Sequence, residues 1–215
     1  MDKRVQRGLR SRQVILDRAV NIASVEGLES LSVRRLATEL EVSKSGVFAQ
    51  FGSKEELQLA TVRAAIDVFS ARVIRPAMKV TAGIRRVRVL SEAWIDYARQ
   101  PVFEGGCFFI STVPEFDTRP GRVRDALASA RRDWHTLYTT TVAEARQLGE
   151  IRPEIDPADL AFELDALARV AAEDAALLDD DPRYDQARRI IADRLRAVAT
   201  DPAALDRSPA ESRQA

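Results

Sequence analysis

Two short helices with a very short connection restrict the fold of this chain more than any other feature of its sequence. Serines stand at positions 32 and 43, and a serine at the N-cap accepts a hydrogen bond from the first helical turn. The apolar residues that follow them at helical spacing are Val33, Leu36, Ala37 and Leu40, then Val47 and Phe51. The sequence therefore predicts two helices of about two turns each, joined by a tight turn.

A longer helix is predicted on each side of this pair. Apolar residues recur at helical spacing over 11–26, and Gly27 follows as a terminator. On the other side, Ser53 and Glu56 have the spacing of a capping box, in which the Ser53 hydroxyl accepts from the Glu56 backbone and the Glu56 carboxylate reaches back. We expect this second helix to span 54–75, with Pro76 ending or kinking it.

The rest of the chain also has helical periodicity. Helices are expected over 82–99, 106–116, 121–148, 156–179 and 184–199, with prolines near most of the boundaries. No stretch alternates apolar and polar residues long enough to predict a strand. We therefore predict an all-α fold of about nine helices: an N-terminal three-helix helix-turn-helix domain and a larger C-terminal helical domain.

The length of 215 residues suits two unequal domains. The boundaries expected from the pattern are 1–53 and 54–201, followed by a flexible tail at 202–215. There is neither a membrane-length apolar run nor a signal peptide, so a cytoplasmic location without membrane contact is expected.

Few residues could support catalysis or hold a metal. Cys107 and His135 are the only cysteine and histidine, which rules out the usual four-ligand zinc site within one chain. Asp133 and His135 are two residues apart and face different sides of a helix, so they cannot form a relay with Ser129. Phosphate-loop, dinucleotide and zinc-protease motifs are lacking, and we predict no enzyme activity, cofactor or metal.

Charge is distributed unevenly along the neutral chain. Residues 1–54 hold 10 Lys and Arg against 6 Asp and Glu, which leaves 23 against 27 for the remainder. The first dozen residues are particularly basic, and we expect a flexible arm, including Arg12, that lies along DNA. The alternative is an ordinary solvated terminus.

The segment Val33–Thr61 resembles the N-terminal domain of the tetracycline-repressor (TetR) family. The residues that carry this resemblance are Ser43, Lys44, Phe48 and Phe51, followed by Lys54-Glu55-Glu56-Leu57. The resemblance implies a dimeric transcription regulator that binds a palindromic operator on double-stranded DNA, and a default of repression relieved by a small-molecule effector. A DNA-binding dimer without effector control and an activator are the alternatives.

Residues expected to touch DNA follow from helix geometry. Contacts to phosphates are expected from Arg12, Ser32, Arg34, Arg35, Ser43 and Lys54. Base contacts are expected from Lys44, Ser45 and Gln50, with Gly46 allowing close approach and Phe48 placed there by the family pattern. Simple capping by the serines and a solvated Gln50 are the alternatives. The chain departs from the family at Glu41, where Gly is usual, and at Phe48 and Gln50, where Tyr and His are common.

The family resemblance also implies that the C-terminal domain binds a ligand and pairs with a second copy. The apolar stripes expected to pair are Leu160, Leu164, Leu167, Ala171, Ile191, Leu195 and Val198. The expected ligand-binding residues are Trp94, Tyr97, Phe103, Cys107, Phe108, Trp134, His135 and Tyr138. The alternative in both cases is burial in the domain's own core. Cys107 could also be oxidised and His135 could sense pH.

Overall fold

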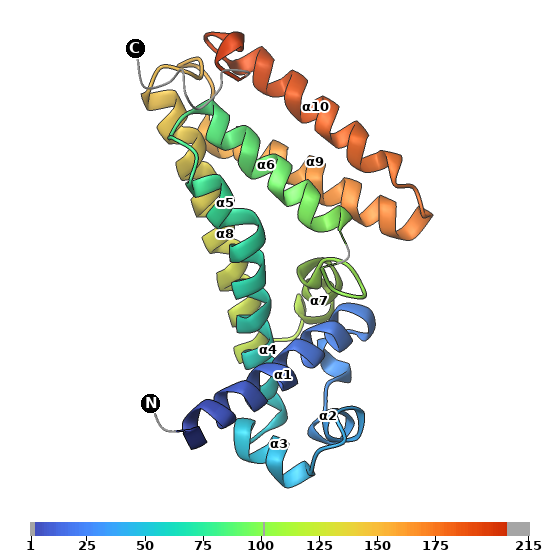
Figure 1. The fold of residues 1–215 in the computed structure, drawn as a ribbon. Coiled ribbons are helices and arrows are strands. Elements are labelled where there is room, and N and C mark those ends of the chain that lie inside the picture. The colour runs from blue at the N-terminus through green and yellow to red at the C-terminus, as the bar shows by residue number, and fades with distance from the viewer. Residues whose placement is uncertain (1–2, 101, 206–215) are drawn as a thin grey trace. The chain divides into compact units, whose positions relative to one another are not determined.

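Serine and glycine caps define the helix-turn-helix region in the computed structural model, which describes residues 3–100 and 102–205, with side chains described from residue 11 onward. The first helices in chain order are α1 Lys3–Glu26, the 3-10 turn η1 Leu28–Ser30, α2 Val33–Glu39, α3 Lys44–Phe51 and α4 Lys54–Phe69 (Figure 1). The Ser32 hydroxyl accepts from Arg35 N at 3.1 Å and the Ser43 hydroxyl from Gly46 N at 3.1 Å. Both predicted N-caps are confirmed.

The remaining elements are η2 Ser70–Ile74, α5 Arg75–Met78, α6 Ile84–Arg99, α7 Phe108–Phe116, α8 Arg122–Gln147, α9 Pro157–Leu178, α10 Pro182–Val198 and η3 Pro202–Leu205. Because α4, η2 and α5 form one unbroken helical run, the described residues contain nine helices besides the short 3-10 turns. Within the described ranges, the only extended pairing is an isolated bridge between Ile151 and Ala199. The predicted all-α class is confirmed.

The helix predicted over 54–75 does not end at Pro76, because a π-helical segment precedes the proline and the helical run continues past it. Within η2 the backbone hydrogen bonds widen, so that Arg75 N donates to Ser70 O, five residues earlier. Proline has no N–H and its ring crowds the preceding turn. A π segment changes the backbone register at such a position, and the helix continues through Pro76 to Met78.

The expected flexible N-terminal arm is also not what the structure contains. Helix α1 begins at Lys3 and continues without interruption through the basic segment to Glu26. The side chains before residue 11 lie outside the described residues, so the structure gives no contacts for them. The apolar periodicity that begins at Ile15 corresponds to buried side chains in the C-terminal part of this longer helix.

One compact unit comprises Met1–Val68 and Pro101–Ala130. In it α2 packs against α3, and α1 packs against α7. Leu28, Leu36, Val47 and Leu57 are fully buried. A segment from the middle of the chain therefore packs with the N-terminal helices.

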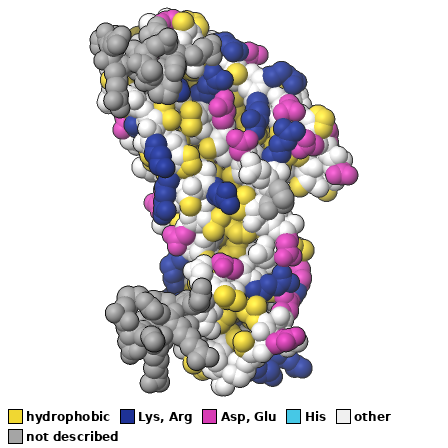
Figure 2. All heavy atoms as spheres, viewed as in Figure 1, with side chains coloured by type: hydrophobic (Ala, Val, Ile, Leu, Met, Phe, Trp, Pro, Cys, Tyr) yellow, Lys and Arg dark blue, Asp and Glu magenta, His cyan; other side chains and the backbone are white. Residues whose placement is uncertain are grey.

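The other compact unit comprises Phe69–Gln100 and Arg131–Ala215. Its helices α6, α9 and α10 pack against one another, and η2 and α5 pack against α6 (Figure 1). Lys and Arg side chains lie beside Asp and Glu side chains over this unit in Figure 2, as expected from the ion pairs of Arg99 with Asp181 and Asp185. These pairs link α6 to the start of α10.

The first part of the expected flexible tail is ordered. Residues Pro202–Leu205 form η3, Leu205 is buried, and its carbonyl accepts a hydrogen bond from Arg88 Nη1 at 3.2 Å. Burial of this leucine stabilises the turn in one conformation. Residues 206–215 lie outside the described residues.

Candidate DNA-binding surface and effector core

The turn between α2 and α3 is a Schellman motif with a glutamate in the position that glycine usually takes. Val42 N donates to Ala37 O at 3.0 Å and Glu41 N to Thr38 O at 3.3 Å, which satisfies the last carbonyls of α2. Glu41 has a φ of 54°, a left-handed conformation that costs a residue with a Cβ about 1 kcal/mol. The positive φ explains why glycine is the usual residue at this position.

Helix α3 has one buried face and one exposed face. Val47 and Phe51 are 0 % and 7 % exposed, and they anchor the helix in its unit. Lys44, Ser45, Gly46 and Phe48 are exposed, and the Gln50 side chain is half-buried. The exposed residues include most of those expected to contact bases, and their small members leave the backbone accessible.

Three of the predicted phosphate-binding side chains have partners within the same unit. Arg35 pairs with both carboxylate oxygens of Glu26 and donates to Glu39 Oε1 at 2.9 Å. Lys54 Nζ lies 2.6 Å from Glu29 Oε1 and 2.7 Å from Glu29 O. These cations hold neighbouring elements together, so a phosphate would have to compete with the carboxylates for them.

The ion pairs around Arg35 shift the pKa values of its partners. The hydrogen bond from Arg35 lowers the pKa of Glu26, and hydrogen bonds from Arg35 and then Arg18 lower that of Glu39. The hydrogen bonds to Glu26 and Glu39 raise the pKa of Arg35. All three groups are therefore charged at neutral pH, and they link α1 to α2.

Arg12 is the third predicted phosphate-binding side chain with a partner in the same unit. Its Nη1 donates to the Gln50 carbonyl, and its guanidinium lies 4.4 Å from the centre of the Phe51 ring. A guanidinium over an aromatic face is attracted by the ring electrons. Arg12 thus fixes the C-terminal end of α3 against α1, while Arg34 and Lys44 stay exposed on α2 and α3.

A contact that the sequence did not predict connects α7 to the end of α1. The Glu115 carboxylate of α7 accepts from Leu28 N at 2.7 Å and from Glu29 N at 2.9 Å. A Cβ on Gly27 would come within 3.0 Å of this carboxylate, and Gly27 has a φ of 83°, so only glycine fits here. Nothing in the local sequence pattern around Glu115 indicates this partner, because 86 or more residues separate it from the N–H groups it caps.

The loop before α7 is fixed to the same end of α1. Glu104 N donates to Asn21 Oδ1 at 3.1 Å, and Gly105 N donates to Ser24 Oγ at 3.0 Å. A Cβ on Gly105 would meet the Ser24 carbonyl oxygen at 2.1 Å. The loop can approach the helix backbone this closely only because residue 105 is glycine.

Four of the predicted ligand-binding residues form one aromatic core in the second unit. Phe69, which the sequence analysis did not single out, lies at its centre. Its ring centroid is 5.7 Å from that of Trp94, 5.2 Å from that of Tyr97 and 5.1 Å from that of Trp134, all edge to face. Tyr138 follows at 5.2 Å from Trp134. Edge-to-face packing at these distances stabilises the core beyond simple burial.

The Tyr138 hydroxyl and the Trp134 indole of this core have hydrogen-bond partners. The Tyr138 hydroxyl bonds to Ser91 Oγ, and burial raises the pKa of Tyr138 above its ordinary value. Trp134 Nε1 donates to the buried Asp165 at 2.7 Å, and Arg131 pairs with the same carboxylate at 2.7 Å. Trp94 Nε1 is buried and has no hydrogen-bond partner among the described residues. Such a donor retains an unmet need for an acceptor.

Of the other predicted ligand-binding residues, three belong to the first unit and one to the second. Phe103, Cys107 and Phe108 belong to the unit that contains α1 and α7, and all three are buried there. His135 lies on α8 beside the core's Trp134, where burial, and next the charge of Arg131, lower the pKa of its imidazole. The structure therefore brings together only part of the predicted set.

The predicted dimer stripes correspond to the inner faces of α9 and α10, which is a correction. Leu160, Leu164, Ile191, Leu195 and Val198 are each at most 2 % exposed within one chain. Ala171 is 6 % exposed, and Leu167 is half-buried. Since α9 and α10 pack on each other, these side chains are covered without a second copy. The alternative reading, burial in the domain's own core, is the one that the structure supports.

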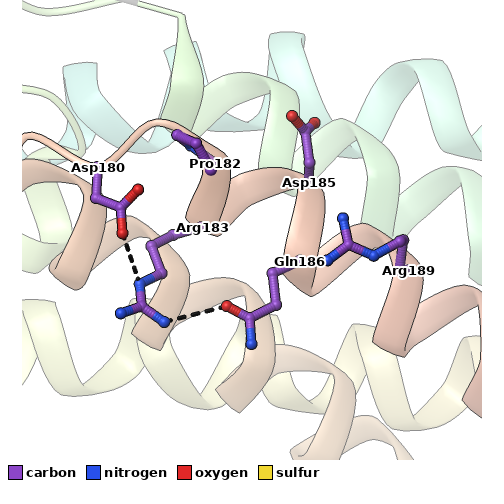
Figure 3. Close-up of a pocket in the computed structure, with 6 residues that line it drawn as sticks. All are labelled: Asp180, Pro182, Arg183, Asp185, Gln186 and Arg189. Atoms are coloured by element: carbon purple, nitrogen blue, oxygen red, sulfur yellow. Dashed lines mark hydrogen bonds and ion pairs between the residues drawn. The ribbon is translucent and has the colours of Figure 1, made fainter.

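A shallow hollow of about 400 Å³ lies at the start of α10 (Figure 3). It is lined by Asp180, Pro182, Arg183, Asp185, Gln186 and Arg189. Within it Arg183 pairs with Asp180 at 3.0 Å and donates to Gln186 at 3.1 Å. This polar surface is unlike the apolar cavity expected for an effector, so we assign the effector site elsewhere.

Neither a membrane-spanning helix nor a metal cluster is found in the part of the chain that the structure describes. No helix there has both the length and the apolar character needed to cross a membrane. No group of three His, Cys, Asp or Glu side chains there could hold a metal ion.

A helix-turn-helix with an exposed second helix, joined to further helices in an all-α chain, defines a class of DNA-binding regulators. Two family models match the sequence: "Bacterial regulatory proteins, tetR family" over residues 15–61 and "Tetracyclin repressor-like, C-terminal domain" over residues 83–191. The chain belongs to the TetR family of transcriptional regulators. No curated protein gives a significant match to the sequence.

Solved structures of similar fold include a TetR transcriptional regulator from Chloroflexus aurantiacus, with a TM-score of 0.83 and 23 % identity over 90 % of this chain and 98 % of that chain. A regulator from Saccharomonospora viridis in complex with choline has a TM-score of 0.73 and 18 % identity over 89 % and 99 %. AibR, in complex with isovaleryl coenzyme A and operator DNA, has a TM-score of 0.67 and 18 % identity over 86 % and 96 %. At these identities the likeness establishes the fold.

Proposed function

We propose that this protein is a homodimeric repressor that binds a palindromic operator through α3 and leaves it when a small molecule occupies the core of the second unit. The observation that carries the DNA-binding part is the exposed face of α3, where Lys44 stands beside the small residues Ser45 and Gly46. A helix with this surface can approach the floor of the major groove closely. In the domain division that goes with this proposal, residues 1–53 bind DNA and 54–201 bind the effector and pair.

The residues predicted to bind DNA divide into three roles under this proposal. Lys44, Ser45 and Gln50 read bases, while Arg34 and the N-termini of α2 and α3 at Ser32 and Ser43 hold phosphates. Arg12, Arg35 and Lys54 are assigned to positioning, because each already joins two elements of the unit. Truncating them would misplace α2 and α3 as well as remove a charge.

The dimer interface is assigned to the outer face of α9 and α10. Large apolar side chains remain exposed there: Phe162 is 63 % exposed, Val170 48 %, Leu177 83 % and Ile190 42 %. Phe162, Val170 and Leu177 are spaced by eight and seven residues, which places them along one side of α9. An exposed apolar stripe of this kind is typical of a protein interface, and a two-fold pair would present two α3 helices to the two halves of a palindrome.

The effector site is assigned to the aromatic core of Trp94, Tyr97, Trp134 and Tyr138 around Phe69. The unpaired Trp94 Nε1 is the supporting observation, because a buried donor without an acceptor is ready to bind one. An effector with an apolar body and a carbonyl or similar acceptor fits this chemistry. The choline and isovaleryl coenzyme A complexes of proteins with this fold support small-molecule control here, without identifying the compound.

Effector binding and DNA binding are coupled, in this proposal, through α6, its following loop and α4. Helix α6 carries Trp94 and Tyr97, and the loop after it holds Glu104 and Gly105 against α1. A shift of α6 on effector binding would pull on these contacts and on the Glu115 caps. The ligand would then favour a conformation in which the two α3 helices no longer match the operator spacing.

The operator proposal is tested on DNA selected by the full-length chain from random duplexes. Lys44→Ala is expected to weaken binding to the selected duplex by about tenfold or more, since one direct base contact is lost. Lys79→Ala is the matched control, because Lys79 is an exposed lysine outside the helix-turn-helix, and it is expected to bind like wild type. Equal effects of the two changes, or failure to enrich any sequence, would contradict the assignment.

Effector control is tested by screening compounds for a rise in Tm and then for release of the selected duplex. Trp94→Phe keeps an aromatic ring and removes the N–H, so an effector's affinity is expected to fall about three- to tenfold. Compounds that bind the core and leave operator affinity unchanged would favour a DNA-binding dimer without effector control. Compounds that tighten operator binding would indicate the opposite sign of regulation.

A further inference from the structure

One exposed side chain of α3 is of the wrong type for an ordinary solvent-facing position. Phe48 is 56 % exposed, whereas Phe51, one turn later on the same helix, is 7 % exposed. Removing a phenyl ring from water is favourable. An exposed phenylalanine on a short polar helix face therefore indicates a contact with another molecule. Val42, in the turn before α3, is also 44 % exposed.

The neighbours of Phe48 indicate that this contact is made with DNA. Lys44 precedes it by four residues and therefore lies on the same side of α3. Ser45, Gly46 and Ala49 are exposed as well, and their small size allows the helix to lie deep in a groove. An apolar ring beside a lysine and a row of small residues matches a surface that approaches base edges.

The major groove offers one apolar group to such a ring. Of the four bases, only thymine presents a methyl group there, while the other edges present hydrogen-bond donors and acceptors. A phenyl ring has no hydroxyl and therefore cannot donate a hydrogen bond to a phosphate oxygen. We propose that Phe48 selects thymine in each operator half-site by packing against its C5-methyl group, with Val42 giving a second apolar contact. This inference rests on the proposed function of α3 as the DNA-reading helix.

The test removes the methyl group from the DNA rather than from the protein. Duplexes selected by the wild-type chain are resynthesised with deoxyuridine in place of thymidine, one position at a time, which keeps base pairing unchanged. At the position read by Phe48, loss of the methyl is expected to weaken wild-type binding about fourfold, equivalent to about 0.8 kcal/mol. Phe48→Ala is expected to bind the thymine and uracil duplexes equally.

Matched variants separate this contact from a general effect on the protein. Leu148→Ala removes a side chain that is 57 % exposed and lies just after α8, so it is expected to keep the fourfold preference for thymine. Val42→Ala is expected to lose the preference at a neighbouring position only.

The outcomes distinguish this inference from the function on which it depends. Tight binding to a selected duplex that is indifferent to uracil at every position overturns the role of Phe48 and leaves the DNA-binding proposal standing. A preference for thymine that persists in Phe48→Ala also overturns it. Failure of the wild-type chain to select any duplex would contradict both proposals.

Discussion

The helix-turn-helix and the α9–α10 pair both have apolar stripes at helical spacing, yet the stripes have different consequences. In α3 the apolar residues Val47 and Phe51 are buried, and most of the opposite face is polar or small. In α9 one stripe is buried, and a second stripe that includes Phe162 and Leu177 stays exposed. Periodicity therefore locates apolar faces, and where a helix has two of them it does not show which one meets a partner.

The sharpest way to test this contrast is to truncate a residue of the inner α9 stripe. Leu164→Ala is expected to lower the free energy of unfolding by about 2–5 kcal/mol, because Leu164 is fully buried and its loss leaves a cavity. Urea unfolding at low protein concentration measures this. Phe162→Ala on the outer stripe should change the monomer by no more than about 0.5 kcal/mol, and comparable losses for the two variants would remove the distinction.

The outer stripe should instead control assembly. Phe162→Asp combined with Leu177→Asp places two charges on the proposed interface, and the dimer dissociation constant is expected to rise about 100-fold or more. Sedimentation velocity over a concentration series measures the change. Leu148→Asp introduces the same charge at a leucine that is 57 % exposed outside these helices, and it should leave the dimer intact. A dimer unaffected by the double substitution would place the interface elsewhere.

The two regions also share a strained backbone position, which gives a smaller and directly comparable effect. Glu41 ends α2 with a φ of 54°, and Asp179 ends α9 with a φ of 52°. Glu41→Gly is expected to raise the free energy of unfolding by up to about 1 kcal/mol. Asp179→Gly should raise the free energy of unfolding by less, since aspartate adopts this conformation more readily than glutamate. Thermal unfolding compares the two, and a destabilised Glu41→Gly protein would show that the glutamate side chain has a contact worth more than the strain.

The smallest expected effect comes from the ion pairs around the helix-turn-helix. Arg35 and Arg18 lower the pKa of Glu39 from its ordinary 4.5, so its contribution to stability is present above that pH and is lost as the pH falls through the lowered value. Glu39→Gln should therefore destabilise the protein at pH 7 by less than about 1 kcal/mol. The difference from wild type should shrink as the pH falls through the lowered pKa of Glu39. Urea unfolding over an acid pH series would reveal a constant difference if the ion pairs contribute nothing.

Local signals in the sequence predicted most of the fold. The caps at Ser32 and Ser43 and the end of α1 before Gly27 all depend on neighbours within a few residues. Such features are set by local hydrogen bonding and sterics, which a single sequence displays. The helix boundaries in the remainder of the chain were predicted to within a few residues for the same reason.

The features that the sequence did not reveal depend on contacts between distant residues. Glu115 caps the backbone at Leu28 and Glu29, and Phe69 lies at the centre of the aromatic core. Neither pairing leaves a local pattern in the sequence. The continuation of the helix past Pro76 was not predicted, because the π segment before it depends on hydrogen-bond register rather than on residue type.

The aromatic core contains the intrinsic fluorescence probes of this protein. The chain contains two tryptophans, Trp94 and Trp134, and both lie against Phe69 in the second unit. Indole emission therefore reports on that unit alone and is silent on the helix-turn-helix. Comparing it with circular dichroism, which sees every helix, would show in the unmodified protein whether the two units unfold together or one after the other.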